Sequence, residues 1–334
     1  MKLASVEKIK EVLPHPNADL LEIVQVLGYQ AIVKKGQYKA NDLVVFIQPD
    51  TVLPDNAEWA KVYKSKSSRV RSIKLRGSWS FGIVENIGLL YTSADDGSAD
   101  LDSLEGTDVS QILNITKYEP PAPQDLNAKG SLPFGLSKTD EERYQNINDL
   151  PYGEIVDVTL KIDGSSGSFY CKLVDDQWVT GITSRTLELN PYCVNKYTTV
   201  NDTHNILGKL KAYCNTHKIN LAFRGEIYGS GIQNFALNAH AKKPLGFALF
   251  NVFNLDTHQY EGTDSPHYYE KVAEVLNIET VPMLEKGVEL TPALIKKYDE
   301  ELETVNGNYF EGVVIKLSGG RSFKVISKIY DSKK

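Results

Sequence analysis

Three prolines within four residues divide this chain into two differently patterned halves. Residues 120–123 read Pro-Pro-Ala-Pro, and such a segment is stiff, extended and unable to continue a helix or a central strand. Short strand patterns with glycine and proline turns precede it, whereas strand and helical patterns alternate after it. We therefore expect a first domain at residues 1–110, a linker and arm at 111–150, and a second domain at 151–334.

The spacing of apolar residues predicts the class of each domain. Before residue 110, short strands predict a small β-barrel or sandwich, with strands at 22–26, 30–33, 43–47, 70–74 and 81–84. After residue 150, strands are expected at 155–160, 168–173, 221–227, 247–252 and 310–316, and helices at 203–215, 268–276 and 292–305. Thr291 is the expected cap of the last helix. The mixture predicts an α+β protein.

Composition excludes several classes of protein. With 334 residues, 41% of them hydrophobic and 24% charged, the chain can bury two ordinary cores. It has no run of 18 apolar residues and no signal-peptide pattern, so we expect no membrane partner and a cytoplasmic location. Three cysteines without CxxC spacing, and six scattered histidines without HExxH, argue against a disulfide framework and a zinc site.

The net charge of −6 hides a strong asymmetry along the chain. Residues 60–77 contain seven lysines and arginines and no acid, whereas residues 95–108 contain six acids and no lysine or arginine. A binding surface responds to its local potential rather than to the total charge. The negative total therefore does not exclude a nucleic-acid partner.

Residues 160–164 contain a candidate nucleophile. They read Leu160-Lys161-Ile162-Asp163-Gly164, so a lysine closes an apolar strand and a glycine turn follows. Such a lysine projects from the strand end into a cleft, where burial or a neighbouring cation can free the amine to attack an electrophile. Taken alone, the pattern Lys-x-Asp-Gly favours the simpler interpretation of an ordinary lysine at a strand–turn junction.

Five further segments follow in a fixed order. They read Thr183-Ser184-Arg185, Phe223-Arg224-Gly225-Glu226, Phe247-Ala248-Leu249-Phe250, Phe310-Glu311-Gly312 and Ser322-Phe323-Lys324. Together with Lys161 they resemble, in turn, the nucleotidyl motifs I, Ia, III, IIIa, IV and V of the superfamily of DNA ligases, RNA ligases and mRNA-capping enzymes. The resemblance spans residues 161–328. It implies a nucleotidyltransferase domain of antiparallel sheets with flanking helices, an ATP-grasp-like ligase fold.

The resemblance places several residues around ATP as the AMP donor. It implies that Lys161 attacks the α-phosphate to form a lysyl-AMP and that Leu160 and Ile162 lie beside the nucleotide. It also implies that Phe247 stacks on the adenine, with Phe250 in the core. An isolated aromatic pair in a strand is otherwise ordinary core, so this assignment depends on the order of the motifs.

Charged residues are expected to neutralise the phosphates and to hold a metal. By resemblance, Glu226 contacts the ribose or a metal, Glu311 helps to bind a metal at the α-phosphate, Lys324 contacts that phosphate, and Arg185 contacts the ribose or RNA. A lysine that attacks ATP meets crowded negative charge, so fixed cations and a divalent metal should dominate catalysis. Carboxylate oxygens suit Mg²⁺ or Mn²⁺ held largely through water.

The last motif departs from the family pattern. Motif V commonly has two lysines separated by one residue, but Val325 and Ile326 follow Lys324. The second cation is Lys316 or Lys328, and the sequence leaves this choice open.

A charged segment precedes the candidate nucleophile. Residues 138–146 read Lys-Thr-Asp-Glu-Glu-Arg-Tyr-Gln-Asn, which is typical of an exposed helix start capped by Thr139 or Asp140. The same stretch resembles a segment of RNA ligases of the Deinococcus/Naegleria type. That resemblance implies that Arg143 contacts a phosphate of ATP or of the RNA end.

The first domain resembles an oligonucleotide-binding (OB) domain, which ligases of this type carry ahead of the nucleotidyl domain. Residues 15–19, His-Pro-Asn-Ala-Asp, look like the turn before a strand in tRNA-binding OB barrels. Alternating cations precede Trp79 and Phe81 and would present charge to phosphates and rings to bases; they are Arg69, Arg71, Lys74 and Arg76. A solvated charged strand explains the same residues equally well.

These expectations combine into an ATP-dependent RNA ligase. It would pass AMP from Lys161 to a 5′-phosphate, and a 3′-hydroxyl would then displace the AMP to seal an RNA break or nick. The RNA preference comes from the resemblance, and we expect a monomer. The alternatives are a DNA ligase, a GTP-dependent mRNA-capping guanylyltransferase, or a non-catalytic RNA-binding protein on a ligase scaffold.

Overall fold

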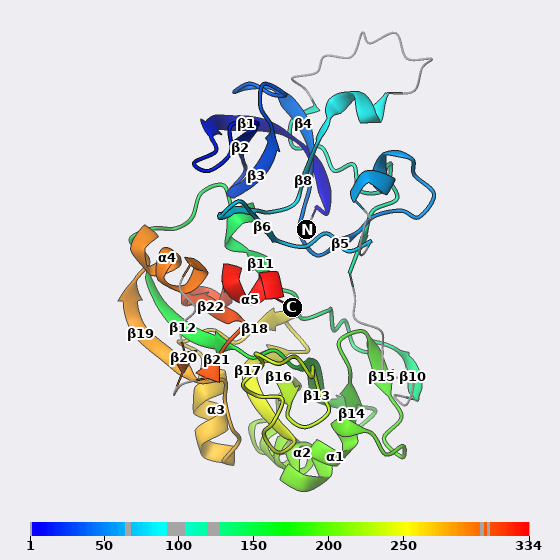
Figure 1. The fold of residues 1–334 in the computed structure, drawn as a ribbon. Coiled ribbons are helices and arrows are strands. Elements are labelled where there is room, and N and C mark those ends of the chain that lie inside the picture. The colour runs from blue at the N-terminus through cyan, green and yellow to red at the C-terminus, as the bar shows by residue number, and fades with distance from the viewer. Residues whose placement is uncertain are drawn as a thin grey trace. The chain divides into compact units, whose positions relative to one another are not determined.

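The structure, a computed structural model, describes residues 2–63, 68–91, 104–118, 127–300, 304–305 and 308–333. They form two compact units (Figure 1). The first comprises Met1–Pro121, Tyr144–Leu150 and Asp331–Lys333, and the second comprises Ala122–Arg143 and Pro151–Tyr330. Residues 111–150, expected as a linker and arm, are thus divided between the two units.

Some features of the sequence lie outside the described residues. They are the proline run at 120–123, the cations at 64 and 66, and residues 95–103 of the acidic stretch. No helix in the described ranges is long and apolar enough to cross a membrane.

The first unit is built on a five-stranded antiparallel sheet. Its strands follow the order β3-β2-β1-β4-β8, with β1 at Ala4–Pro14, β2 at Leu21–Val26, β3 at Tyr29–Lys34, β4 at Leu43–Ile47 and β8 at Ile83–Asn86. The long β1 pairs with β4 along its first half and with β2 along its second half. The apolar pattern did not predict β1, because charged residues such as Glu7 and Lys8 interrupt its alternation.

Both faces of this sheet are covered, which explains the continuous apolar sequence of β4. Val44 and Phe46 pack into one cluster of buried residues, whereas Val45 and Ile47 pack into another on the opposite face. Smaller elements complete the unit, namely β5 (Thr51–Val52) paired with β9 (Thr116–Lys117), and the 3-10 helices η1 (Trp59–Tyr63) and η2 (Ile87–Leu90).

A separate hairpin contains part of the cationic stretch. Its strands are β6 (Ile73–Leu75) and β7 (Ser78–Ser80). Arg76 and Gly77 form the turn with positive φ values of 47° and 92°, as two-residue hairpin turns require. The strand expected at 70–74 therefore begins three residues later.

The second unit contains two larger sheets. The seven-stranded sheet runs β10-β15-β14-β13-β16-β17-β18, and its strands are Ala128–Ser131, Leu187–Leu189, Gln177–Thr183, Ser165–Val174, Leu221–Tyr228, Gly246–Asn254 and Gln259–Tyr260. The five-stranded sheet runs β11-β23-β22-β12-β19, and its strands are Glu142–Arg143, Ser322–Ile326, Gly312–Leu317, Ile155–Lys161 and Met283–Glu289. Each strand predicted for this domain overlaps one of these. A two-residue pair, β20 (Thr304–Val305) and β21 (Asn308–Tyr309), is also formed.

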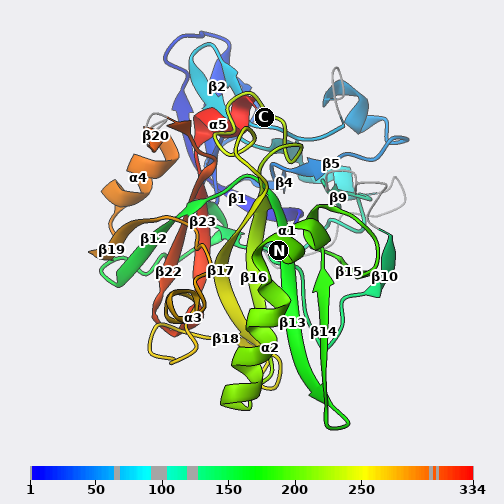
Figure 2. The ribbon, with the colours of Figure 1, turned by 90° about the horizontal axis from the view of Figure 1, so that it is seen from below.

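The helices flank these sheets, and the α+β class is confirmed. α2 (Ile206–His217) lies against β13 and β16 (Figure 2). The helix predicted at 203–215 is two helices, because Asn205 adopts the left-handed conformation (φ 51°) and separates α2 from α1 (Lys196–His204). α3 spans Tyr269–Leu276 and α5 spans Lys328–Lys333.

The last predicted helix has the expected start but an earlier end. α4 spans Pro292–Glu300, and the Thr291 hydroxyl accepts a hydrogen bond from the Leu294 amide at 3.1 Å, which confirms the predicted cap. Residues 304–305 form β20 instead of continuing this helix to 305.

Candidate active site

Strand register brings the lysines of the first and last motifs to the same face of the five-stranded sheet. Thr159 of β12 lies opposite Val314 of β22, and Val314 lies opposite Lys324 of β23. Directly opposed residues, and residues two apart on one strand, point to the same face. Lys161 and Lys324 therefore share one face. The alternate residues of these strands, Leu160 and Val313 among them, are buried on the other face.

Lys161 is ion-paired with the glutamate of the fourth motif. Its Nζ donates to Glu311 Oε2 at 2.5 Å, and the two side chains are 27% and 12% exposed. Lys161 lies opposite Gly312 in the sheet, so Glu311 comes from the residue just before β22. A protonated amine has no lone pair, so Lys161 must lose a proton before it can act as a nucleophile.

Glu226 reaches the same site from the seven-stranded sheet. It lies opposite Ser166 on β13, and the Ser166 hydroxyl donates to Glu226 Oε2 at 3.1 Å. Burial raises the pKa of Glu226 to about 7, against the opposing effects of the positive Lys161 and the Ser166 hydrogen bond. The site thus contains a carboxyl group that titrates near neutral pH.

The glycine of the Lys-x-Asp-Gly turn is required by close packing against β16. A Cβ atom on Gly164 would lie 2.4 Å from the Ile227 carbonyl oxygen and 2.8 Å from Glu226 Cγ. No side chain fits at these distances without a shift of the backbone. This contact holds the turn after Lys161 next to Glu226.

Sequence reasoning missed two positioning contacts at this turn. Asp163 is 5% exposed; its Oδ2 accepts a hydrogen bond from the Tyr330 hydroxyl at 2.9 Å, and its carbonyl accepts one from Asn238 Nδ2 at 2.8 Å. Burial and the negative Asp163 raise the pKa of Tyr330 well above its usual value, so this phenol remains a donor. The motif itself could have identified Asp163, but Tyr330 lies in a short C-terminal helix with no sequence signal.

Helix α5 also contacts the fourth motif. The Ser327 amide donates to the Glu311 carbonyl at 2.9 Å, and the Ser327 hydroxyl accepts from the Tyr330 amide at 3.4 Å. The start of α5 therefore connects the backbone of Glu311 to the side chain of Asp163, although these residues are far apart in the sequence.

Arg143 lies beside Lys324. Residues 142–143 form the strand β11 rather than a helix start, and Arg143 pairs with Lys324 in parallel orientation. Arg143 is 7% exposed. The structure thus brings together two of the cations that the sequence analysis assigned to phosphates.

Arg185 is held by the same charged segment. Its Nη2 donates to Asp140 Oδ1 at 2.7 Å and to Asp140 Oδ2 at 2.8 Å. Both side chains keep part of their surface exposed, at 26% and 33%. The guanidinium is therefore oriented by a carboxylate without being buried.

Phe247 is buried on the sheet face away from Glu226. It lies opposite Ile227, whereas Ala248 lies opposite Glu226, so Phe247 points to the face away from Glu226. It is 3% exposed and packs edge-on against Phe169 at 5.0 Å. The stacking role of Phe247 remains a prediction, and the burial of the ring on this face argues against it. Phe250, predicted as core, lies at a break in the β16–β17 register and is partly exposed.

The two candidates for the second lysine of the last motif have different surroundings. Lys316 lies opposite Asp157, four residues from the position opposite Lys161, or about 13 Å along the strand. Its Nζ donates to the Phe250 carbonyl and to Asn251 Oδ1 and lies 3.9 Å from the centre of the Tyr269 ring. Burial lowers the pKa of Lys316 to about 7. Lys328 is ion-paired with Asp299 at 2.7 Å.

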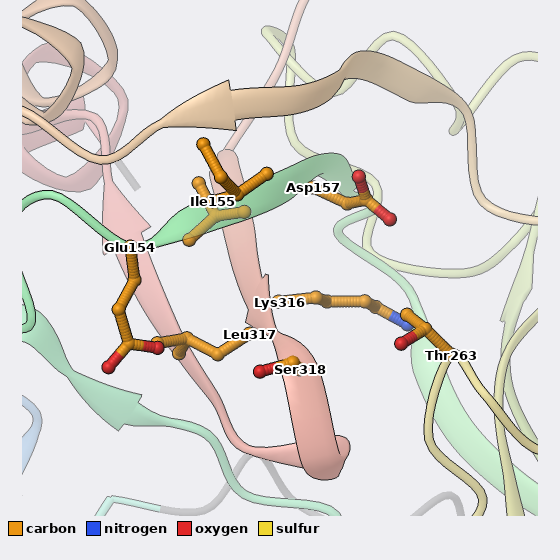
Figure 3. A pocket seen from close by; sticks show the side chains of 8 residues that line it. Glu154, Ile155, Asp157, Thr263, Lys316, Leu317 and Ser318 are labelled. Atoms are coloured by element: carbon orange, nitrogen blue, oxygen red, sulfur yellow. The ribbon is translucent and has the colours of Figure 1, made fainter.

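Lys316 borders a cavity of about 500 Å³ at the far end of β12 (Figure 3). Its amine points towards Thr263, with Asp157 on the neighbouring strand. The lining includes neither Lys161 nor Glu311. This cavity is therefore separate from the nucleophile.

The four cations predicted to bind nucleic acid differ in their surroundings. Arg69 is ion-paired with Asp50, and its guanidinium lies 4.1 Å from the Tyr118 ring centre, so it stabilises its own unit. Arg71, Lys74 and Arg76 are exposed, and the Lys74 amine lies 5.4 Å from the Trp79 ring.

The His-Pro-Asn-Ala-Asp turn contacts the hairpin formed by β6 and β7. His15 Nε2 is within hydrogen-bonding distance of the Leu75 carbonyl, at 3.2 Å, and Asn17 Nδ2 donates to the Arg76 carbonyl at 3.0 Å. The turn therefore positions the exposed cations of this hairpin.

Comparisons with known proteins agree with this fold. A family model described as an OB-fold domain matches residues 3–87, and one described as RNA ligase matches residues 154–328. A mutant Naegleria gruberi RNA ligase solved with AMP and Mn is 28% identical, with a TM-score of 0.83 over 100% of this chain and 99% of that chain. Naegleria gruberi RNA ligase with PPi is 29% identical, with a TM-score of 0.80 over 99% and 98%. A comparison with curated proteins gave no match.

The OB-fold domain and the two-sheet domain that follows it, with a lysine and acidic residues in its site, place the chain among the polynucleotide ligases. Within that class, the chain belongs to the RNA ligase family and is an enzyme that joins RNA ends.

Proposed function

We propose that this enzyme transfers AMP from ATP through Lys161 and joins RNA ends that carry a 3′-hydroxyl and a 5′-phosphate. One observation carries the proposal: Lys161 is paired with Glu311 at 2.5 Å on the sheet face that it shares with Lys324. Structures of the Naegleria gruberi enzyme were solved with AMP, ATP, PPi and Mn. These ligands support ATP and a divalent metal for this chain.

In the first step, the Lys161 amine attacks the α-phosphorus of ATP. A nitrogen–phosphorus bond forms, the bond from the α-phosphorus to the bridging oxygen breaks, pyrophosphate leaves, and the amine loses a proton. Lys324 and Arg143 lie side by side on the sheet and would neutralise the charge that develops on the phosphates. The RNA 5′-phosphate then takes AMP from the lysine, and the 3′-hydroxyl displaces AMP to form the phosphodiester.

The residues around Lys161 fit a hard divalent cation. Glu311 and Glu226 supply the oxygen donors that Mg²⁺ or Mn²⁺ prefers, and the bound metal would neutralise charge at the α-phosphate. In the described ranges, no three His, Cys, Asp or Glu side chains converge closely enough to hold a metal. We therefore propose that these two glutamates hold it through water. If Glu311 held such a metal, Lys161 would lose its ion-pair partner and could release its proton more easily.

We assign the nucleotide contacts as follows. The backbone of Leu160 and Ile162 flanks the nucleophile and would border the adenosine, while Arg185, oriented by Asp140, would contact the ribose or the RNA. Phe250 replaces Phe247 as the proposed adenine-stacking ring, because it is the partly exposed one of the two.

The exposed cations of the OB-fold domain are proposed to contact RNA phosphates. Arg71, Lys74 and Arg76 lie on or next to the hairpin that His15 and Asn17 hold in place. Trp79 on the same hairpin adds an aromatic ring of the kind that stacks on bases.

Self-labelling with ATP tests the nucleophile. Incubation with α-labelled ATP and Mn²⁺ should label the wild-type protein covalently, whereas Lys161→Ala and Lys161→Arg should show no label, because arginine keeps the charge but cannot supply the amine. Lys296→Ala, at an exposed lysine on α4, is the matched control and should label normally. Labelling of Lys161→Ala would refute the proposal.

A further inference from the structure

Two surface segments next to the nucleophile contain no acidic residue. They are residues 190–196 and 229–245, and their cations are Lys196, Lys242 and Lys243. At the average acid content of this chain, 24 residues would carry about three acids. Both segments therefore have a net positive charge, although the protein as a whole is negatively charged.

The two segments are joined to each other and to the active-site turn. Lys196 Nζ donates to the Gly231 carbonyl, which links the first segment to the second. Asn238 Nδ2 in the second segment donates to the Asp163 carbonyl at 2.8 Å, two residues from the nucleophile. The Tyr197 hydroxyl, next to the first segment, donates to the Ser166 carbonyl at 3.4 Å. The acid-free surface, residues 190–196 with 229–245, thus adjoins the turn that follows the reacting lysine.

The first segment presents two apolar side chains to solvent. Tyr192 is 93% exposed and Val194 is 89% exposed, the highest values among the large hydrophobic residues that the structure describes. Large hydrophobic side chains are rarely exposed this far, and two in one loop mark an interaction site more often than isolated ones do.

The loop that carries these side chains is held by hydrogen bonds. The Asn190 side chain accepts from the Tyr192 amide at 3.0 Å, and the Thr198 hydroxyl donates to the Cys193 carbonyl at 2.9 Å. Asn127 Nδ2 contacts Cys193 Sγ at 3.0 Å. The exposed ring is therefore part of a shaped loop, and its stacking on a partner costs less conformational entropy than ordering a free loop would.

We propose that the acid-free surface binds unpaired nucleotides of the RNA beside the joined ends, with Tyr192 stacked on a base and Lys242 near a phosphate. Cations without acids suit a polyanion, and an exposed aromatic ring beside them suits a base of any sequence. The inference rests on the proposed function and extends it, because it names the part of the ligase domain that holds the RNA once AMP is on Lys161.

Separation of the adenylylation step from RNA binding tests this surface. Tyr192→Ala should keep the wild-type rate of self-labelling with α-labelled ATP, which needs no RNA, but should weaken binding of a fluorescent single-stranded RNA by about tenfold. Tyr192→Phe should restore the binding. Val275→Ala, at another exposed hydrophobic residue, on α3, is the control and should change neither the rate of self-labelling nor the affinity for RNA.

A second variant tests the charge. Lys242→Ala should lower the slope of log Kd against log salt by about one, whereas Tyr192→Ala should leave that slope unchanged. The proposal is overturned if Tyr192→Ala binds RNA as tightly as the wild type or if it loses self-labelling. It is also overturned if light scattering shows that the wild type is a dimer and that the only effect of Tyr192→Ala is to dissociate it, because the surface would then bind a second copy of the chain. Absence of self-labelling in the wild type would instead refute the proposed function, and RNA binding would still report on this surface.

Discussion

At the scale of single residues, the active site depends on how charge is shared around one lysine. Lys161 is bonded to Glu311 at 2.5 Å, and Glu226 lies close enough for the lysine charge to affect its pKa. The sequence analysis identified all three through the order of motifs, without their geometry. The motifs do not contain side-chain distances. Only the structure shows that Glu311 pairs with the lysine, whereas Glu226 bonds to Ser166.

The titration of Glu226 gives a pH prediction. Burial raises its pKa from 4.5 to about 7, so the folded protein keeps a proton here that the unfolded chain loses above pH 4.5. The stability gained from this proton is complete below pH 4.5 and is lost as the pH rises to 7, by up to about 3 kcal/mol. Urea unfolding at pH 5 and pH 7.5 should show this loss in the wild type.

The control is Glu226→Gln, which has no proton to lose and should lack this part of the pH dependence. Wild-type self-labelling with Mn²⁺ should also increase between pH 6 and pH 8, because the proposed role in holding the metal needs the ionised carboxylate. Identical pH dependence of stability in the wild type and in Glu226→Gln would contradict the assignment.

The two phenylalanines of β17 should respond differently to truncation. Phe247→Ala should destabilise the fold by about 3–5 kcal/mol, because the ring is buried against Phe169. Phe250→Ala should cost less stability but raise the ATP concentration needed for half-maximal self-labelling by about tenfold, since stacking on a base contributes about 1–3 kcal/mol. Denaturant unfolding and ATP titration measure the two effects. The reverse pattern would restore the sequence-based assignment to Phe247.

At the scale of elements, helix α5 contributes to the site although it carries none of the six motifs. Its Tyr330 hydroxyl bonds to Asp163, and Ser327 before it bonds to the Glu311 backbone. Periodicity cannot find such a short helix, because six residues are fewer than two full turns. In the same way, a single left-handed residue, Asn205, divided the helix that the apolar pattern predicted as one.

Removal of one hydroxyl tests the role of α5. Tyr330→Phe should slow self-labelling by about tenfold and cost about 1–3 kcal/mol of stability, because buried Asp163 loses a hydrogen bond. Tyr213→Phe, on α2, removes a hydroxyl bonded to His267 and should leave labelling unchanged. If Tyr330→Phe destabilises the protein but labels at the wild-type rate under stable conditions, Tyr330 stabilises the fold and does not position Asp163 for catalysis.

At the scale of the whole molecule, the OB-fold unit should contribute to RNA binding without being needed for AMP transfer. Joint replacement of Arg71, Lys74 and Arg76 by alanine should lower the slope of log Kd against log salt by up to about three. Self-labelling should keep its wild-type rate, because these residues lie in the other unit from Lys161. Arg69→Ala should behave differently. Loss of the ion pair with Asp50 should lower the free energy of unfolding more than it changes the salt slope. An unchanged salt slope in the triple variant would argue that the hairpin is a solvated surface.

The sequence alone predicted the features that depend on neighbouring residues or on the order of motifs along the chain. The strand patterns, the cap at Thr291, the α+β class and the order of motifs from Lys161 to Lys324 all depend on neighbouring residues or on their succession, and these were sufficient to indicate an RNA ligase. The arrangement of the site residues also required the register of the sheets. Pairing of β12 with β22, and of β22 with β23, brings residues about 150 positions apart to one face. Pairing of β16 with β17 turns Phe247 away from Glu226. A shift of one residue in a strand reverses which face a side chain points to, and only the packed sheets select one register.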